Sequence, residues 1–119
     1  VVAVTGDGGF MFNVQEMATA VLHNIPLVTI LFNDNTFGNV KRNQKNDYNE
    51  RYIACDLHNP DFMKLAESFG MMGLRVDSAE GLQGAMEKAF AEDGPVLIEV
   101  EVGPMEGLWP LMPLKRAKD

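Results

Sequence analysis

The sequence predicts an α/β fold, an open parallel sheet of about four strands with helices on both faces. Strand-like and helix-like segments alternate along the chain, and strands that are separated by helices pair in parallel. Segment 27–32 is apolar on both faces, as a central strand of a parallel sheet is. The chain has 119 residues and shows no repeat or linker, which is typical of a single domain.

The first half of the chain predicts two strands and two helices. Residues 1–5 are apolar and β-branched, and a glycine-rich turn at 6–9 ends this strand. Asn13, with Glu16 three residues later, forms the pattern of a capping box and predicts the start of a helix. The strand 27–32 follows, and the polar residues 36–58 predict a short helix and then a loop.

The second half predicts two more helices, each followed by a strand. Asn59, Pro60 and Asp61 resemble a helix cap, a first-turn proline and an N-terminal acid. Gly70 is expected to end that helix, and 74–76 form a short third strand. Asp77 with Glu80 is the predicted cap of the last helix. The fourth strand covers 96–102.

The start of the chain predicts a piece of a longer protein. Residues 1–4 already form a strand, and no initiator Met or targeting peptide precedes it. We therefore expect the sheet to be incomplete at its N-terminal side, with residues 1–119 a truncated domain.

Composition excludes several classes of protein. Ten Lys and Arg against seventeen Asp and Glu give a net charge of −7, which argues against a sequence-independent nucleic-acid binder. The apolar run 25–32 is far shorter than the roughly 20 residues of a membrane-spanning helix, so no membrane partner is expected. Cys55 is the single cysteine, so a disulfide framework is excluded and a reducing, cytoplasmic compartment is expected.

Polar residues follow the first two predicted strands where each strand ends. Asp7 lies within Gly6-Asp7-Gly8-Gly9, and Asp34 lies within Asn33-Asp34-Asn35. If the two strands are neighbours, the two carboxylates can converge beyond the carboxyl edge of the sheet, where ligands bind in such folds. Oxygen ligands suit Mg²⁺, and exposed glycine amides suit a phosphate. The pair therefore predicts a metal-bridged diphosphate site.

Simpler interpretations of these two motifs exist. Each motif by itself is more often only a tight turn or a loop. A dinucleotide-binding motif is excluded because Met11 occupies the third glycine position, and no Gly-Lys-Ser/Thr sequence for a P-loop follows.

The two motifs and the segment between them closely resemble the diphosphate-binding motif of thiamine-diphosphate enzymes, Gly-Asp-Gly followed by a helix, a strand and Asn-Asn. Here 27 positions separate Asp7 from Asp34, a spacing that fits the motif. The residues of 10–20 and 24–26 also resemble the family. Within it, the resemblance is closest to the acetolactate synthase and benzoylformate decarboxylase branch and spans nearly the whole chain.

The resemblance implies a role for each matching position. The Mg²⁺ ligands would be Asp7, Asp34 and the carbonyl of Thr36. Residues at the thiamine diphosphate would be Gly6, Asp7, Gly8, Gly9, Asn35 and Phe37, and Val40 would lie at the edge of the substrate pocket. The family usually has Asn at position 34, so Asn33 or Asn35 could replace Asp34 as the ligand. We hypothesise that Asp34 binds the metal because its register matches.

The resemblance also implies a parent enzyme that decarboxylates or carboligates a 2-oxo acid. The glutamate that activates the cofactor comes from another domain of a neighbouring subunit in this family, so this chain holds no catalytic residue and is expected to be inactive alone. Missing N-terminal domains and a homo-oligomeric parent are therefore expected. Pyruvate decarboxylases carry an acid at the position of Val40, and its absence here favours carboligation, as in acetolactate synthase.

Two alternatives remain open, and a third is disfavoured. The parent could resemble benzoylformate or oxalyl-CoA decarboxylase. The domain could be a non-catalytic assembly module with a vestigial cofactor site. A flavodoxin-like or phospho-acceptor domain that uses Asp7 lacks the supporting residues.

Overall fold

The computed structural model describes residues 1–103, which form a single sheet of four parallel strands in the order β1-β2-β4-β3. The strands are β1 (Val2–Gly6), β2 (Val28–Asn33), β3 (Met72–Val76) and β4 (Val96–Glu101). The predicted α/β class is therefore confirmed. The neighbouring positions of β1 and β2 satisfy the condition under which the two polar turns share one edge of the sheet.

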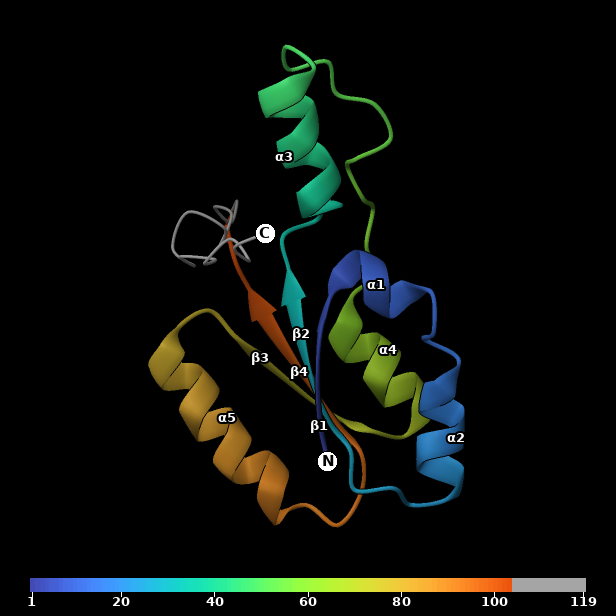
Figure 1. Cartoon of the computed structure of the whole chain (residues 1–119). Coiled ribbons are helices and arrows are strands. Elements are labelled where there is room, and N and C mark those ends of the chain that lie inside the picture. Colours follow the sequence, from blue (N-terminus) through green and yellow to red (C-terminus); the bar gives the residue numbers. More distant parts are fainter. Residues whose placement is uncertain (104–119) are drawn as a thin grey trace, which may run out of the picture.

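Helices cover both faces of this sheet (Figure 1). They are α1 (Asp7–Met11), α2 (Glu16–Leu22), α3 (Gly38–Asp47), α4 (Phe62–Phe69) and α5 (Ala79–Ala91). In Figure 1, α5 lies on one side of the sheet, α1, α2 and α4 lie on the other, and α3 extends beyond the carboxyl edge.

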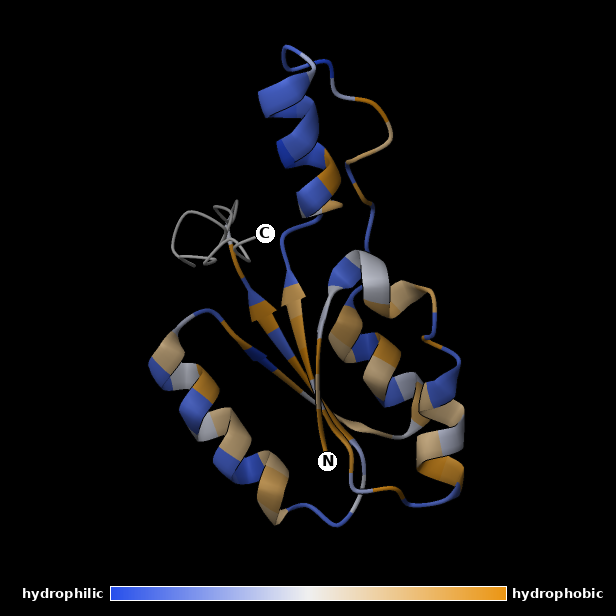
Figure 2. Ribbon diagram, in the orientation of Figure 1, coloured by the Kyte–Doolittle hydropathy of each residue, from blue (hydrophilic) through white to orange (hydrophobic). Residues whose placement is uncertain are grey.

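Two hydrophobic clusters hold the layers together. On the α5 face, Ile30 and Ile98 pack with Ala85 of the helix. On the opposite face, Leu31 packs with Phe62 of α4. Figure 2 shows the resulting pattern of apolar central strands and a mostly hydrophilic α3. Because burial of apolar surface is the main favourable term in folding, these two clusters fix the edge from which the polar turns project.

The strand β1 is the least covered part of the described sheet. Val2 and Val4 pair in register with Val28 and Ile30, yet they are 43% and 66% exposed. The helix α5 packs on β2, β3 and β4 and leaves this part of the face open. This exposure agrees with the expectation that the sheet is incomplete on the β1 side.

Three predicted helix starts are wrong. A helix already begins at Asp7, directly after β1. Asn13 does not cap α2 with its side chain; only its backbone carbonyl accepts a hydrogen bond, from the N–H of Glu16. At α4 the cap is Asp61, whose side chain accepts hydrogen bonds from two backbone N–H groups of the first turn. Ser78, not Asp77, caps α5. In the last two cases a second capping residue stood within two positions of the predicted one, and the path of the chain decides which of them is used.

Other predicted features are confirmed. Gly70 ends α4 in the left-handed conformation with φ of 80°, as a glycine after a helix commonly does. Segment 36–58 forms a helix and then a loop, as expected. The third and fourth strands lie within two residues of their predicted bounds.

Candidate functional site

A cleft of about 200 Å³ lies beyond the carboxyl ends of β1 and β2. Its lining residues are Gly6, Asp7, Gly8, Gly9, Thr36, Phe37, Gly38, Asn39 and Val40. Seven of these are residues that the sequence predicted for the site. The fold therefore brings the glycine-rich turn and the start of α3 together, as the topology of a parallel sheet requires.

Asp7 is a buried carboxylate in this cleft. It is 2% exposed, because it is the first residue of α1 and lies over the end of β1. Its Oδ1 accepts a hydrogen bond from the backbone N–H of Gly8 at 2.9 Å, and its Oδ2 accepts one from the side chain of Asn59 at 2.6 Å. Both donors are neutral.

Asp7 has no cationic partner within residues 1–103. The other fully buried carboxylate, Glu99, is 1% exposed and forms an ion pair with Arg75 at 2.8 Å. A buried charge is costly unless it is paired or binds a metal. The cleft thus presents one buried negative charge that the described residues do not neutralise.

Glycines of the first turn line part of the cleft. A Cβ at Gly8 would lie 2.5 Å from the ring of Phe37, which is closer than real contacts allow. That ring stacks on Phe12 with centroids 6.4 Å apart. A Cβ at Gly6 would meet nothing within 4 Å, so this position opens toward space in which a ligand can lie.

Asp34 and Asn35 do not line this cleft. Oδ1 of Asp34 accepts a hydrogen bond from the backbone N–H of Thr36 at 3.0 Å. Its Oδ2 lies 3.1 Å from the place of a Cβ on Gly38, a lining residue. Asn35 adopts a left-handed conformation with φ of 57°. The Asp34 carboxylate thus lies next to a lining residue of the cleft.

The turn after β2 is held by a second segment of the chain. Thr36 and Asp56 form an antiparallel bridge, in which Phe37 donates to the carbonyl of Cys55 and Leu57 donates to that of Asn35, both at 2.8 Å. Neither hydrogen bond uses the carbonyl of Thr36. The predicted backbone ligand therefore keeps its oxygen outside this bridge.

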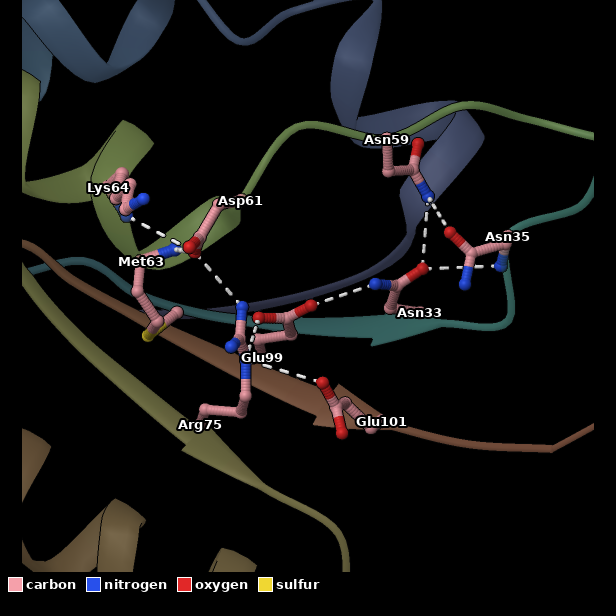
Figure 3. Close-up of polar contacts among 9 residues, drawn as sticks. All are labelled: Asn33, Asn35, Asn59, Asp61, Met63, Lys64, Arg75, Glu99 and Glu101. Atoms are coloured by element: carbon pink, nitrogen blue, oxygen red, sulfur yellow. Dashed lines mark hydrogen bonds and ion pairs between the residues drawn. The ribbon is translucent and has the colours of Figure 1, made fainter.

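Sequence reasoning missed Asn59, which the sequence predicts only as a helix cap. Its side chain instead contacts Asp7 and the two asparagines that follow the second strand, Asn33 and Asn35. Figure 3 shows Asn59 pointing toward these two asparagines. One signal in the sequence could have indicated this. Asp61, two residues later, is an equally good helix cap, so Asn59 is not needed as a cap and is available for other contacts.

A polar network continues from Asn33 across the sheet (Figure 3). Asn33 donates to Glu99 at 2.8 Å, and Arg75 contacts Glu99, Asp61 and Glu101. The hydrogen bond to Glu99 raises the pKa of the Arg75 guanidinium above its ordinary value. The Arg75 guanidinium, which is charged in any case, neutralises the buried Glu99 carboxylate.

Two kinds of site receive no support from the described residues. Residues 1–103 hold no group of three or more His, Cys, Asp or Glu that could bind a metal without other ligands. In the same range, no helix has both the length and the apolar character that crossing a membrane requires. Because no such group of side chains is present in this range, a metal at Asp7 would also need backbone oxygens and oxygens of a bound cofactor as ligands.

Comparison with known proteins identifies the family. Residues 1–100 match the family model of the thiamine pyrophosphate enzyme, C-terminal TPP binding domain. The chain belongs to this family. The resemblance inferred from the two polar turns is thereby confirmed for the C-terminal TPP binding domain.

Curated relatives of this TPP binding domain are acetolactate synthases. The chain is 45% identical over 102 residues to the acetolactate synthase of Bacillus subtilis, covering 86% of this chain and 18% of that protein. It is 37% identical over 114 residues to the acetolactate synthase isozyme 2 large subunit of Escherichia coli, covering 95% and 21%. The chain thus spans about a fifth of the length of the curated relatives that it matches.

Solved structures share its fold. A thiamine diphosphate-dependent 4-hydroxybenzoylformate decarboxylase of Rhodococcus jostii superposes with a TM-score of 0.82 at 32% identity, covering 90% of this chain and 20% of that one. A benzoylformate decarboxylase of Polynucleobacter necessarius gives the same TM-score at 23% identity, which supports the fold alone.

Proposed function

We propose that this chain binds the diphosphate of thiamine diphosphate through Mg²⁺, as one domain of an enzyme that decarboxylates or carboligates a 2-oxo acid. The observation that carries the proposal is the buried Asp7 carboxylate, which has no cationic partner within residues 1–103. A divalent cation would neutralise such a charge and would take diphosphate oxygens as further ligands. This also explains how a chain of net charge −7 can hold a diphosphate.

Mg²⁺ suits the donors at this edge of the sheet. It prefers oxygen ligands and is usually bound by one or two carboxylates together with phosphate oxygens, rather than by an all-protein cage. Asp7, Asp34 and the carbonyl of Thr36 would supply the protein ligands. Asp34 has one oxygen engaged by Thr36, while its other oxygen lies beside Gly38 at the cleft.

The diphosphate would lie over the glycine-rich turn. Gly6 has open space where a side chain would be, so the backbone there can approach a ligand closely. We expect Gly8, Gly9 and Asn35 to contribute polar groups, and the Phe37 ring to lie beside the cofactor. Val40, which is 46% exposed and lines the cleft, would form the edge of the substrate pocket.

The parent enzyme is proposed to be acetolactate synthase-like. The names of the curated relatives support this, and Val40 in place of an acid favours carboligation. When bound, thiamine diphosphate supplies the carbanion and the electron sink for reaction at a 2-oxo acid. The activating glutamate would come from another domain of a neighbouring subunit, so we propose a homo-oligomeric, cytoplasmic enzyme in which this domain holds and orients the cofactor.

Calorimetric titration of the full-length protein with thiamine diphosphate tests the proposal. We expect saturable binding with Mg²⁺ present, no binding in EDTA, and loss of binding in Asp7→Ala. Asp56→Ala is a matched control, because this exposed aspartate already has a cationic partner, Lys41 of α3. No binding at all in the unmodified protein would instead favour an assembly module with a vestigial site, and equally tight binding in EDTA would contradict the role of Mg²⁺.

A further inference from the structure

The side-chain amide of Asn59 lies among three oxygen atoms. Its Nδ2 is 2.6 Å from Oδ2 of Asp7, 3.0 Å from Oδ1 of Asn33 and 3.3 Å from Oδ1 of Asn35. Asn59 reaches Asp7 from 52 positions away in the sequence. One amide group thus joins the two polar turns of the site.

Neighbouring charges fix the orientation of these amides. The Glu99 carboxylate can only accept hydrogen bonds, so Asn33 turns its NH₂ group toward Glu99 and its oxygen toward Asn59. Asn59 must then present its own NH₂ group, which is the group that the Asp7 carboxylate requires. Glu99 is 1% exposed and paired with Arg75. The carboxylate that orients Asn33 is therefore itself held in place.

The arrangement holds the Asp7 carboxylate without saturating it. Gly8 donates to one carboxylate oxygen and Asn59 to the other. Each oxygen of a carboxylate can accept two hydrogen bonds, so each keeps a lone pair for a cation. The two donors therefore restrict rotation of the carboxylate while its binding capacity remains.

Asn59 is pinned by its own segment as well. Two residues later, Asp61 caps α4 and pairs with Arg75 at 3.1 Å, and Arg75 also holds Glu99. The chain on both sides of Pro60 is thus tied to one network. A rigid support of this kind is what ligands of a metal commonly have in their surroundings.

We propose that Asn59 is a positioning residue of the cation site, which orients the Asp7 carboxylate and the asparagines after β2 for Mg²⁺. This inference rests on the proposed function, and it adds a residue that acts on the metal through Asp7. The segment before α4, which contains Asn59, would then contribute to cofactor binding.

The test measures the Mg²⁺ concentration that half-saturates binding of thiamine diphosphate to the full-length protein, by calorimetry at fixed cofactor. We expect Asn59→Ala to raise this concentration about tenfold, as loss of a residue that supports a metal ligand typically does. Gln44→Ala is the matched control. Gln44 of α3 anchors the loop before α4 through two hydrogen bonds to the backbone of Ile53. The hydrogen bonds of Asp7 within residues 1–103 come from Gly8 and Asn59 and do not involve Gln44, so we expect a shift of less than about twofold.

Two results of this measurement would overturn the inference. An Asn59→Ala value equal to that of the unmodified protein would overturn the inference, as would a Gln44→Ala shift as large as that of Asn59→Ala, since loosening of the loop would then explain both. If Asn59→Ala does not fold, Asn33→Ala replaces it, with a smaller increase expected and an unchanged value overturning the inference. If the unmodified protein binds the cofactor equally well without Mg²⁺, the proposed function itself fails.

Discussion

Two buried carboxylates of this domain differ in their partners. Glu99 and Asp7 are 1% and 2% exposed, yet Glu99 has the guanidinium of Arg75, and Asp7 has two neutral N–H donors. The first is a structural ion pair beside the site. Asp7 is instead suited to bind a cation, because no described residue neutralises its charge.

The role of Asp34 can be separated from that of its neighbours by substitution. We expect Asp34→Ala to raise the Mg²⁺ concentration needed for cofactor binding by about tenfold or more, since a ligand is lost. Asp34→Asn keeps one side-chain oxygen and should lose less. Calorimetry of the full-length variants measures both values. Unchanged Mg²⁺ dependence in Asp34→Ala would transfer the role to Asn33 or Asn35.

Gly8 is expected to tolerate no side chain. A Cβ there would lie 2.5 Å from the Phe37 ring, so Gly8→Ala must displace that ring, at a cost of about 1–3 kcal/mol in the free energy of unfolding. Gly6→Ala has nothing within 4 Å of the new atom and should change stability by less than about 0.5 kcal/mol. Urea unfolding of the two variants checks this, and equal stabilities would show that Phe37 adapts freely.

Sequence reasoning predicted candidate residues that belong to a local motif and missed a cleft residue that depends on tertiary contacts. The first turn predicts Asp7, and the family resemblance implies Thr36, Phe37 and Val40; the structure brings all four into one cleft. Asn59 contacts residues 26 and 52 positions away, so no local pattern reveals these contacts.

At the scale of elements, α4 begins at the point where the sheet and the site are tied together. Asp61 caps the helix and pairs with Arg75. Burial acts to raise the pKa of the Asp61 carboxyl, but the hydrogen bonds from the backbone of Lys64 and Met63, together with Arg75, outweigh it and lower the pKa. The folded state therefore favours the ionised form of this group.

This lowered pKa predicts a pH dependence. The folded pKa lies below the ordinary value of 3.8, so the stabilising contribution of Asp61 is present above 3.8 and is lost as the pH falls through the folded value. Asp61→Asn can still cap the helix but cannot titrate. We expect its free energy of unfolding to fall less steeply in acid.

Urea unfolding between about pH 5 and pH 2 measures this slope, since unfolded aspartate titrates near pH 3.9. Asp93→Asn serves as the control, because Asp93 is exposed and forms no ion pair within residues 1–103. Identical slopes for Asp61→Asn and the unmodified chain would contradict the account.

The elements themselves were largely predictable, and their starts were less so. Alternating apolar segments determine strands and helices over many residues, so all four strands appear where expected. A cap depends on one side chain and one N–H group. Ser78 and Asp77 are both suitable, and the hydrogen bond from Gly81 to Ser78 selects the former.

For the whole molecule, the charge and the topology support one interpretation. A net charge of −7 disfavours anionic ligands in general, yet the parallel sheet collects a buried carboxylate and a glycine-rich turn at a single cleft. The proposed divalent cation between protein and diphosphate would reconcile the two facts. Val2 and Val4 of β1 remain exposed, which fits a domain that forms part of a larger enzyme.

The central claim is that Asp7 binds a divalent cation together with thiamine diphosphate. Crystals of the full-length protein, grown with thiamine diphosphate and with Mn²⁺ in place of Mg²⁺, allow the metal to be located from its anomalous scattering. The account predicts a peak within coordination distance of a carboxylate oxygen of Asp7 and of the diphosphate. Bound cofactor with no such peak, or with the metal held elsewhere, would contradict it.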